Sequence, residues 1–462
     1  MQKNIFRHFV FALAVSAAAF QFAASGQGAA PDITTQAGLV TEFDVNGMKV
    51  LVKRRPGSAT IAAGLFFRGG TKNLTAQNAG IESFTLNVAT EGSVAFPRVA
   101  LRRELASTGS NISSGSNYDY SVLALASTLE NFDRSWKAFV DVALNPAFAP
   151  ADVELTREKT LTSIRNSEDD PDGFLQVLVN RTINAKTPYE NDPSGTVETI
   201  SKFKVADLRA YHQSMMETSR LLLVIVGDVD AATIKQKVTD AFGKLPRGNY
   251  KEAPTTSFDF SKPTLDITQR ALPTNYVQGI FNAPSINNPD FYAMRVATTI
   301  LRDRVFEEVR VKRNLSYAPS ADMGSLAANS GNIYVTAVDA NQAIRVMLDE
   351  IRKLKTEPVD PKDISGVTGQ FLTTYFIGQE TNAAQAAELA RYELNGGGWR
   401  NAFQFLNRAR EVRPADIQAV ANKYMKNIRF VVLGNPAAID RSIFLQTQPT
   451  ATSGPVAWLS AH

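Results

Sequence analysis

The chain contains no cysteine and only three histidines among its 462 residues. The lack of thiols excludes disulfides, thiolate metal ligands and a cysteine nucleophile. The histidines are His8 near the start of the chain, His212, and His462 at the final position. We therefore do not expect a metal site built from imidazoles of this chain, and any transition metal would have to be bound by another molecule.

An excess of charge of one sign is also missing. The chain has 49 Lys and Arg against 45 Asp and Glu, which gives a formal net charge of +4. The basic residues are scattered among acids instead of forming a stripe, so nucleic acid and anionic membrane surfaces are not expected as partners. A hydrophobic content of 44% supports full globular folding, and the length favours about two to four domains.

The first 26 residues have the composition of a secretory signal peptide. Lys3 and Arg7 precede an apolar run at 9–20, and small residues at 23–26 follow. A membrane anchor is less favoured, because the run is shorter than the roughly 18 to 20 residues that cross a bilayer. Removing residues 1–26 takes away two cations and lowers the net charge from +4 to +2. We expect a periplasmic or secreted protein that is not attached to a membrane.

Two distant passages of the chain match almost position for position, which indicates an internal duplication. Each begins with a helical pattern containing Asp207 or Asp416, and each ends with an apolar strand that stops at Gly227 or Gly434. The two offsets are 209 and 207 residues. Two homologous halves of about 200 residues, separated by a small gap, account for both offsets.

The patterns of the mature chain favour an α+β fold of two homologous domains of the α/β-sandwich type, because strands and helices mix without a regular βαβ rhythm. We predict an N-terminal domain at 32–245 and a C-terminal domain at 265–448. The segment 246–264 is rich in proline and has no sustained period, so it is predicted to be a linker. Residues 449–462 form the tail.

Several short motifs carry a resemblance to one known family. These motifs are Asn46-Gly47 before a strand, Phe67-Arg68-Gly69-Gly70-Thr71, Ala79-Gly80-Ile81, the segment from Asn166 to Pro171, and Val226-Gly227-Asp228. Together they resemble the pitrilysin or insulinase family of zinc peptidases, the inverzincins, over nearly the whole mature chain. The chain looks similar to the short bacterial members and to the subunits of mitochondrial processing peptidase, which pair as dimers. The resemblance implies half of a clamshell.

The zinc motif of that family is degenerate in this chain. In active members the helix after the Gly-Ile step carries His-x-x-Glu-His, which supplies two ligands and a general base. Ser83 and Asn87 stand at the histidine positions, and Leu86 stands at the position of the base. The resemblance places Ser163, 76 residues after Asn87, where the family has a third ligand, a glutamate. None of these side chains suits its role, so no metal is expected in this chain.

Two alternatives would use neighbouring side chains. Glu158 and Glu168 lie five residues on either side of Ser163, and such a shift turns a helical side chain about 140° from the ligand face. We interpret both as solvent-facing charges. A serine-based centre formed by Ser83, Glu82 and Ser163 lacks a positioned base, because His212 belongs to another helix.

The second half keeps a different family element, the Arg-x6-Tyr pair formed by Arg310 and Tyr317. The resemblance implies that the arginine holds a substrate carbonyl and that the tyrosine hydroxyl stabilises the developing oxyanion. The alternative is that Arg310 forms an ion pair and Tyr317 closes the end of a strand. We expect a strand to start at Leu315.

Two further segments resemble substrate-binding parts of the family. Asn395, Gly396, Gly397 and Gly398 resemble the glycine-rich loop of the non-zinc subunit of mitochondrial processing peptidase, although a helix C-cap explains them equally well or better. The run from Ser113 to Ala126 contains the strand that, in this family, forms a sheet edge for extended peptides.

We weigh two functions. In the first, the chain is the non-zinc subunit of a heterodimeric peptidase: a homologous partner binds zinc, and Arg310 and Tyr317 act on the peptide substrate across the interface. In the second, the chain is a catalytically dead homologue that binds peptides or serves as a scaffold. An independent hydrolase is excluded by the residue inventory.

Overall fold

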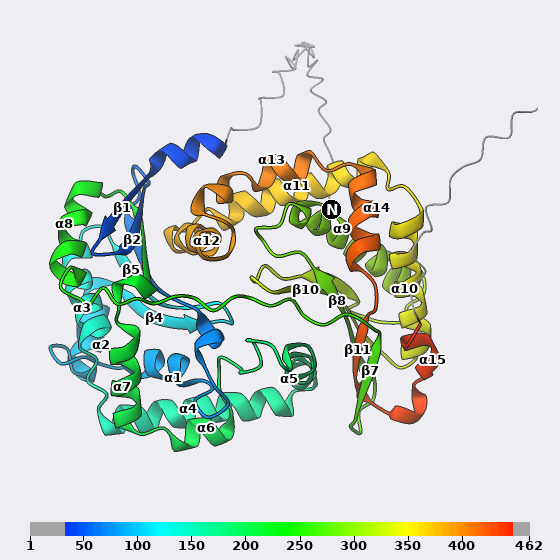
Figure 1. Cartoon of the computed structure of the whole chain (residues 1–462), viewed down its shortest axis with the longest axis horizontal. Helices are drawn as coiled ribbons and strands as arrows, with labels where there is room; N and C mark the ends of the chain where they lie inside the picture. Colours follow the sequence, from blue (N-terminus) through cyan, green and yellow to red (C-terminus); the bar gives the residue numbers. More distant parts are fainter. Residues whose placement is uncertain (1–32, 447–462) are drawn as a thin grey trace, which may run out of the picture.

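The computed structural model describes residues 33–446, and both the predicted signal peptide and the predicted tail lie outside this range. Figure 1 shows two α/β units side by side, each built on one β-sheet with helices packed around it. Within residues 33–446, no helix is both long and apolar enough to cross a membrane. The α+β class and the half-clamshell arrangement are confirmed.

The N-terminal unit contains a six-stranded sheet. Its elements are η1 (Ile33–Leu39), β1 (Val40–Val45), β2 (Met48–Arg54), β3 (Thr60–Arg68), η2 (Gly70–Asn73), α1 (Ile81–Ala89), α2 (Arg98–Thr108), β4 (Asn111–Ser116), β5 (Tyr120–Thr128), α3 (Phe132–Leu144), α4 (Pro150–Asp169), α5 (Pro171–Asn184), α6 (Val197–Lys202), α7 (Val205–Met215), η3 (Thr218–Arg220), β6 (Leu221–Gly227) and α8 (Ala231–Phe242).

The C-terminal unit contains a five-stranded sheet and follows a segment, 246–263, without helix or strand. Its elements are β7 (Thr264–Gln269), β8 (Asn275–Ala283), α9 (Asp290–Val305), η4 (Phe306–Val311), β9 (Ser320–Met323), β10 (Asn329–Ala337), α10 (Ala340–Thr356), α11 (Pro361–Gly378), α12 (Asn382–Asn395), η5 (Trp399–Phe403), α13 (Phe405–Arg410), α14 (Pro414–Tyr424), β11 (Arg429–Gly434), η6 (Pro436–Ala438) and α15 (Arg441–Phe444).

The two sheets repeat the same topology. The order β2-β6-β3-β5-β4 in the first sheet corresponds to β7-β11-β8-β10-β9 in the second, and β1 is an addition at the edge of the first. The first pair is parallel and the other three are antiparallel in both sheets. The helices α7 and α14 start with equivalent capping boxes, in which Asp207 and Asp416 accept from the backbone N–H of Lys204 and Arg413. The predicted duplication is therefore present in the fold.

Each unit sends one helix onto the sheet of the other. Helix α12 of the C-terminal unit packs against β3 and β6, and helix α5 of the N-terminal unit packs against β8 and β11. As a result, Leu389 of α12 shares one hydrophobic core with Phe66 and Val224 of the first sheet. Because apolar burial of this kind is a main source of stability, the two units form one interlocked body.

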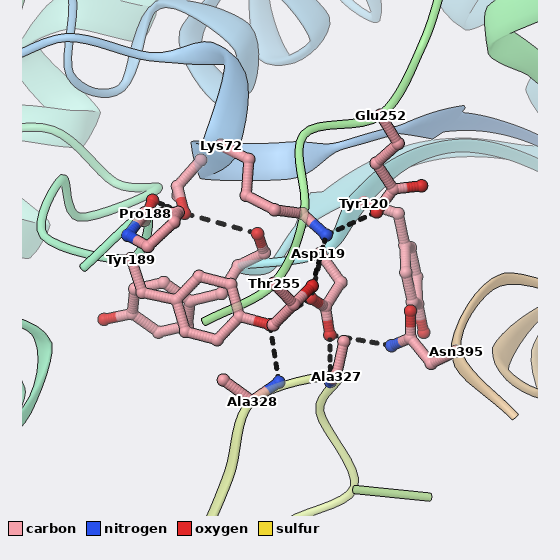
Figure 2. Close-up of polar contacts among 12 residues, drawn as sticks. Lys72, Asp119, Tyr120, Pro188, Tyr189, Glu252, Thr255, Ala327, Ala328 and Asn395 are labelled. Atoms are coloured by element: carbon pink, nitrogen blue, oxygen red, sulfur yellow. Dashed lines mark hydrogen bonds and ion pairs between the residues drawn. The ribbon is translucent and has the colours of Figure 1, made fainter. Parts of the chain in front are cut away.

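A buried polar cluster joins the two units, and its Lys72 forms an ion pair with Glu252 of the segment between them, as shown in Figure 2. The Asp119 carboxylate, at the turn between β4 and β5, accepts from Nδ2 of Asn395 at 2.7 Å and from the backbone N–H of Ala327 at 2.9 Å. It also accepts from the hydroxyl of Tyr189 and lies 3.7 Å from Nζ of Lys72. Burial, reinforced by the Asp119 charge, raises the pKa of Tyr189, so its hydroxyl stays protonated as a donor. We call these five residues the Asp119 cluster.

One buried cation in the C-terminal unit is destabilising. Lys355 in α10 is 2% exposed, and its ammonium has no hydrogen-bond partner. Burial, with a smaller effect from Lys426, lowers the pKa of Lys355 from 10.5 to about 8. Because the folded-state value lies below the unfolded one, the unfolded chain binds more protons between these two pH values, and the stability contributed by this group rises with pH across that window.

We predict that Lys355→Met raises the free energy of unfolding at pH 7 by about 1 to 3 kcal/mol, because it removes an unpaired buried charge and keeps the packing volume. Urea denaturation of both proteins checks this. The gain should shrink as the pH rises past 8, where the folded wild-type lysine loses its charge. A variant less stable than wild type at pH 7 would show that the ammonium has a stabilising partner.

Candidate functional site

The degenerate zinc positions lie on a helix that starts at a tight backbone contact. Helix α1 begins after Gly80, which has φ 85°. A Cβ atom at Gly80 would lie 2.5 Å from Cα of Gly195, so only glycine allows this approach. The Gly-Ile step identified in the sequence therefore sets the start of the helix on which Ser83 and Asn87 lie.

The structure brings three of the four degenerate positions together. Ser83 and Asn87 of α1 and Ser163 of α4 line one pocket between the two helices. Leu86, the fourth, does not line it; this side chain is 2% exposed and belongs to the core behind the sheet. We call this cavity the α1–α4 pocket.

An ion pair adjoins these positions on the pocket wall. Nζ of Lys159 lies 2.9 Å from Oε1 of Glu91, and both residues line the α1–α4 pocket. Burial opposes ionisation of Glu91, but Lys159, Arg98 and Arg102 outweigh it and hold the pKa of this carboxyl below its usual value. Sequence reasoning missed this pair, although Glu91 follows Asn87 by four residues and Lys159 precedes Ser163 by four, the helical spacing that places residues on one face.

The pocket does not suit a zinc ion. Serine hydroxyls and an asparagine amide are weak neutral ligands, and the ammonium of Lys159 would repel a cation. Glu158 does not join the pocket but lies on the adjoining groove along α4, whereas Glu168 lines neither and is 3.8 Å from Arg181. Within residues 33–446, no group of three His, Cys, Asp or Glu side chains is placed to hold a metal.

Asn87 connects the pocket to the edge of the N-terminal sheet. Oγ of Ser114, in edge strand β4, donates to Oδ1 of Asn87 at 2.7 Å. Within residues 33–446, this strand pairs with β5 alone, so its other side is an unpaired sheet edge. An extended peptide added to β4 would therefore pass beside the pocket.

A buried ionic group supports α1 from behind. Oε2 of Glu82 accepts from the guanidinium of Arg220 and from the hydroxyl of Tyr211, the latter at 2.7 Å. Burial raises the pKa of Tyr211, and the negative charge of Glu82 raises it further. This hydroxyl therefore stays protonated and acts as a donor. Oε2 of Glu82 is therefore engaged by two donors, Glu82 does not line the α1–α4 pocket, and His212 is held by Ala143 O at 2.8 Å. Neither residue is available to activate a serine in the pocket.

Arg310 and Tyr317 form a stacked pair in the other unit. Arg310 lies in η4, a π-helical segment, and its guanidinium carbon is 4.2 Å from the ring centroid of Tyr317 and 5.1 Å from that of Phe306. Among the described residues, no side-chain hydrogen bond or ion pair engages this guanidinium. Tyr317 is 79% exposed. The pair therefore presents unused donors to solvent, and π-helical turns are frequent at functional sites.

The strand expected at Leu315 is wrong, because β9 starts only at Ser320. Asn314 adopts a left-handed conformation with φ 50°, and the backbone N–H of Leu315 donates to Val309 O at 2.9 Å. This pattern closes the end of η4 and is typical of a helix C-terminus. Tyr317 therefore lies in a loop, and neither Tyr317 nor Arg310 lines the α1–α4 pocket.

The glycine-rich loop closes a helix. Gly396 is the C-cap of α12, and the N–H groups of Gly396 and Gly398 both donate to Tyr392 O. Asn395 is buried and belongs to the Asp119 cluster. Gly397 has φ 74°, a left-handed conformation that favours glycine.

Comparison with known protein families decides the affiliation. Residues 49–197 match the model of the insulinase family, peptidase family M16, and residues 202–394 match the model of the M16 inactive domain. The chain belongs to the M16 peptidase family. An uncharacterized zinc protease of Mycobacterium tuberculosis is 22% identical over 86% of this chain and 93% of its own length. The mitochondrial-processing peptidase subunit beta of Blastocladiella emersonii is 21% identical over 84% of this chain and 87% of its own length.

Solved structures of the M16 type share the fold. A protease from Helicobacter pylori has a TM-score of 0.78 at 15% identity and covers 86% of this chain and 99% of its own. The first half of the periplasmic protease PqqL from Escherichia coli has a TM-score of 0.70 at 15% identity and covers 88% and 95%, respectively. This M16 chain therefore corresponds in fold to one half of a longer protease.

Proposed function

We propose that this M16 homologue is the non-zinc subunit of a heterodimeric zinc metallopeptidase that degrades peptides. A homologous partner supplies the zinc site, and this chain supplies Arg310 and Tyr317 across the interface. The observation that carries the proposal is the stacked Arg310–Tyr317 pair, which keeps its donors unused in a chain whose own metal positions are unsuited to zinc.

The chemistry of the pair fits stabilisation of an anionic intermediate. A guanidinium offers a rigid fork of donors to a substrate carbonyl, and stacking between Phe306 and Tyr317 limits its freedom before substrate arrives. A phenolic hydroxyl donates to an oxyanion as negative charge develops on it. In this arrangement the partner activates the water, and this chain lowers the energy of the tetrahedral intermediate.

The compartment and the substrate follow from other features. The leader-like residues 1–26 and the periplasmic location of the related protease PqqL favour a periplasmic or secreted enzyme. The free edge of β4 favours extended peptides as substrates. The second candidate, a catalytically dead peptide-binding or scaffolding homologue, uses the same edge but gives Arg310 and Tyr317 no task.

The proposal predicts how the purified chain behaves alone and with a partner. Alone, it is expected to contain no stoichiometric zinc by elemental analysis and to hydrolyse no peptide. After co-purification with a homologous subunit that carries His-x-x-Glu-His, the pair should cleave peptides in a zinc-dependent manner. Stoichiometric zinc in the isolated chain would refute the assignment. If the partner alone cleaved peptides as fast as the assembled pair, the scaffolding function would be favoured.

A further inference from the structure

The α1–α4 pocket is a cavity of about 360 Å³ with a polar wall. It adjoins a second cavity that runs along α4, and the two share Lys159 and Ser163 on their walls. The ammonium of Lys159 therefore lies where a peptide bound in either cavity would contact it. This wall carries a cationic group beside Ser83, Asn87 and Ser163, the degenerate zinc positions.

Three cations share one carboxylate beside the pocket. Arg98, Arg102 and Lys159 all pair with Glu91, and Arg98 also pairs with Asp152. Lys159 is the cation among the residues that line the two cavities, and the acids Glu158 and Asp170 line the second cavity but not the α1–α4 pocket. Lys159 uses one of its three N–H donors on Glu91, and no other ion pair of Lys159 is present in the described chain.

Neutral donors complete the wall. Because Oδ1 of Asn87 accepts from Ser114, the amide N–H₂ group of Asn87 is turned away from that bond and has no protein partner among the described residues. Thr156 also lines the pocket; it is 5% exposed, and its Oγ1 has no hydrogen-bond partner. A buried hydroxyl without a partner is costly unless a ligand or water engages it.

We propose that the α1–α4 pocket binds the C-terminal carboxylate of an extended peptide that pairs with edge strand β4. Lys159 neutralises the carboxylate, and the amide of Asn87 and the hydroxyl of Thr156 donate to it. The hydrogen bond from Ser114 to Asn87 places the pocket directly beside the strand on which the peptide would lie. The chain would thereby recognise peptide ends by itself, without zinc or a partner, so this inference goes beyond the proposed function.

The test measures binding of a short fluorescein-labelled peptide to the purified chain by anisotropy. The peptide is used as the free acid and as the C-terminal amide. We expect the free acid to bind about tenfold more tightly, because charge-assisted hydrogen bonds form only with the carboxylate. Lys159→Gln should abolish this preference, and Asn87→Leu should reduce it, with circular dichroism confirming that both variants are folded.

A matched control is Lys423→Gln. Lys423 is also an exposed lysine in one ion pair, 2.7 Å from Asp290, but it lies in the C-terminal unit away from the pocket. This variant should keep the preference for the free acid. Equal binding of acid and amide by the wild type, or a preference that survives in Lys159→Gln, would overturn the proposal. Displacement of the peptide by acetate at the same concentration would also overturn it, because it would indicate a general anion site.

Discussion

Replacing Asp119 with alanine is expected to lower the free energy of unfolding by about 3 to 5 kcal/mol, the cost of breaking a buried charged group. The Asp119 side chain has no exposed surface. Its removal leaves the hydroxyl of Tyr189, the amide of Asn395 and the backbone N–H of Ala327 without their acceptor. Lys72 would keep Glu252 and Thr255 as partners, so the loss arises mainly from the orphaned donors. Urea denaturation followed by fluorescence measures the change.

The control for this prediction is Asp133→Ala. Asp133 also forms an ion pair, 2.7 Å from Lys237, but its side chain is 79% exposed. Exposed pairs contribute little, so this variant should change the stability by less than about 1 kcal/mol. If Asp119→Ala were as mild as Asp133→Ala, the Asp119 cluster would not hold the two units together. Their joint stability would then come from the exchanged helices α5 and α12 and from other contacts between the units, such as the bond from Trp399 Nε1 to Glu42.

The duplication was predictable because its signals are local and repeated. Asp207 and Asp416 begin equivalent helices, and the offset between them is nearly the offset between Gly227 and Gly434. A capping residue acts on its own helix, so it can be identified without the rest of the fold. The family resemblance assigned Asn87 and Ser163 to one degenerate site, and in the structure both residues line one pocket.

Contacts between the units could not be predicted, because they join residues far apart in the chain. Neither the position of Asp119 nor that of Asn395 indicates that their side chains meet. The exchange of α5 and α12 could not be predicted for the same reason. Both helices have apolar faces, but an apolar helix face does not specify which sheet it covers. Leu86 shows a related limit, since alignment with a motif gives its position in the chain, whereas packing turns its side chain into the core.

The strand expected at Leu315 shows how local backbone geometry can override a pattern. Leu315, Ser316 and Tyr317 follow a helix, and Tyr317 is a residue type enriched in strands. However, Asn314 tolerates the left-handed conformation better than most residues, and it ends η4 with a turn. This turn places Tyr317 beside Arg310 and leaves its ring exposed. The geometry of the stacked pair therefore also depends on the turn at Asn314.

Tyr317→Phe is expected to lower turnover of the assembled heterodimer by about 10² to 10³, the usual cost of losing one donor to an oxyanion. The substitution keeps the aromatic ring, so Arg310 should remain stacked at its present position, 4.2 Å from the ring centroid. Subunit assembly and KM should change little, because the hydroxyl acts mainly in the transition state. Steady-state cleavage of a fluorogenic peptide, with size-exclusion chromatography of the pair, measures both quantities.

Tyr424→Phe is the matched control, because it also removes one tyrosine hydroxyl from the C-terminal unit. That hydroxyl donates to Asp290 at 2.8 Å and lies outside the stacked pair. Its loss should reduce stability slightly and leave turnover unchanged. Equal activity of Tyr317→Phe and wild type would assign Tyr317 a structural role and favour the scaffolding function. A selective loss of kcat in Tyr317→Phe would instead place the hydroxyl at the reacting carbonyl. The scaffolding function predicts no such loss.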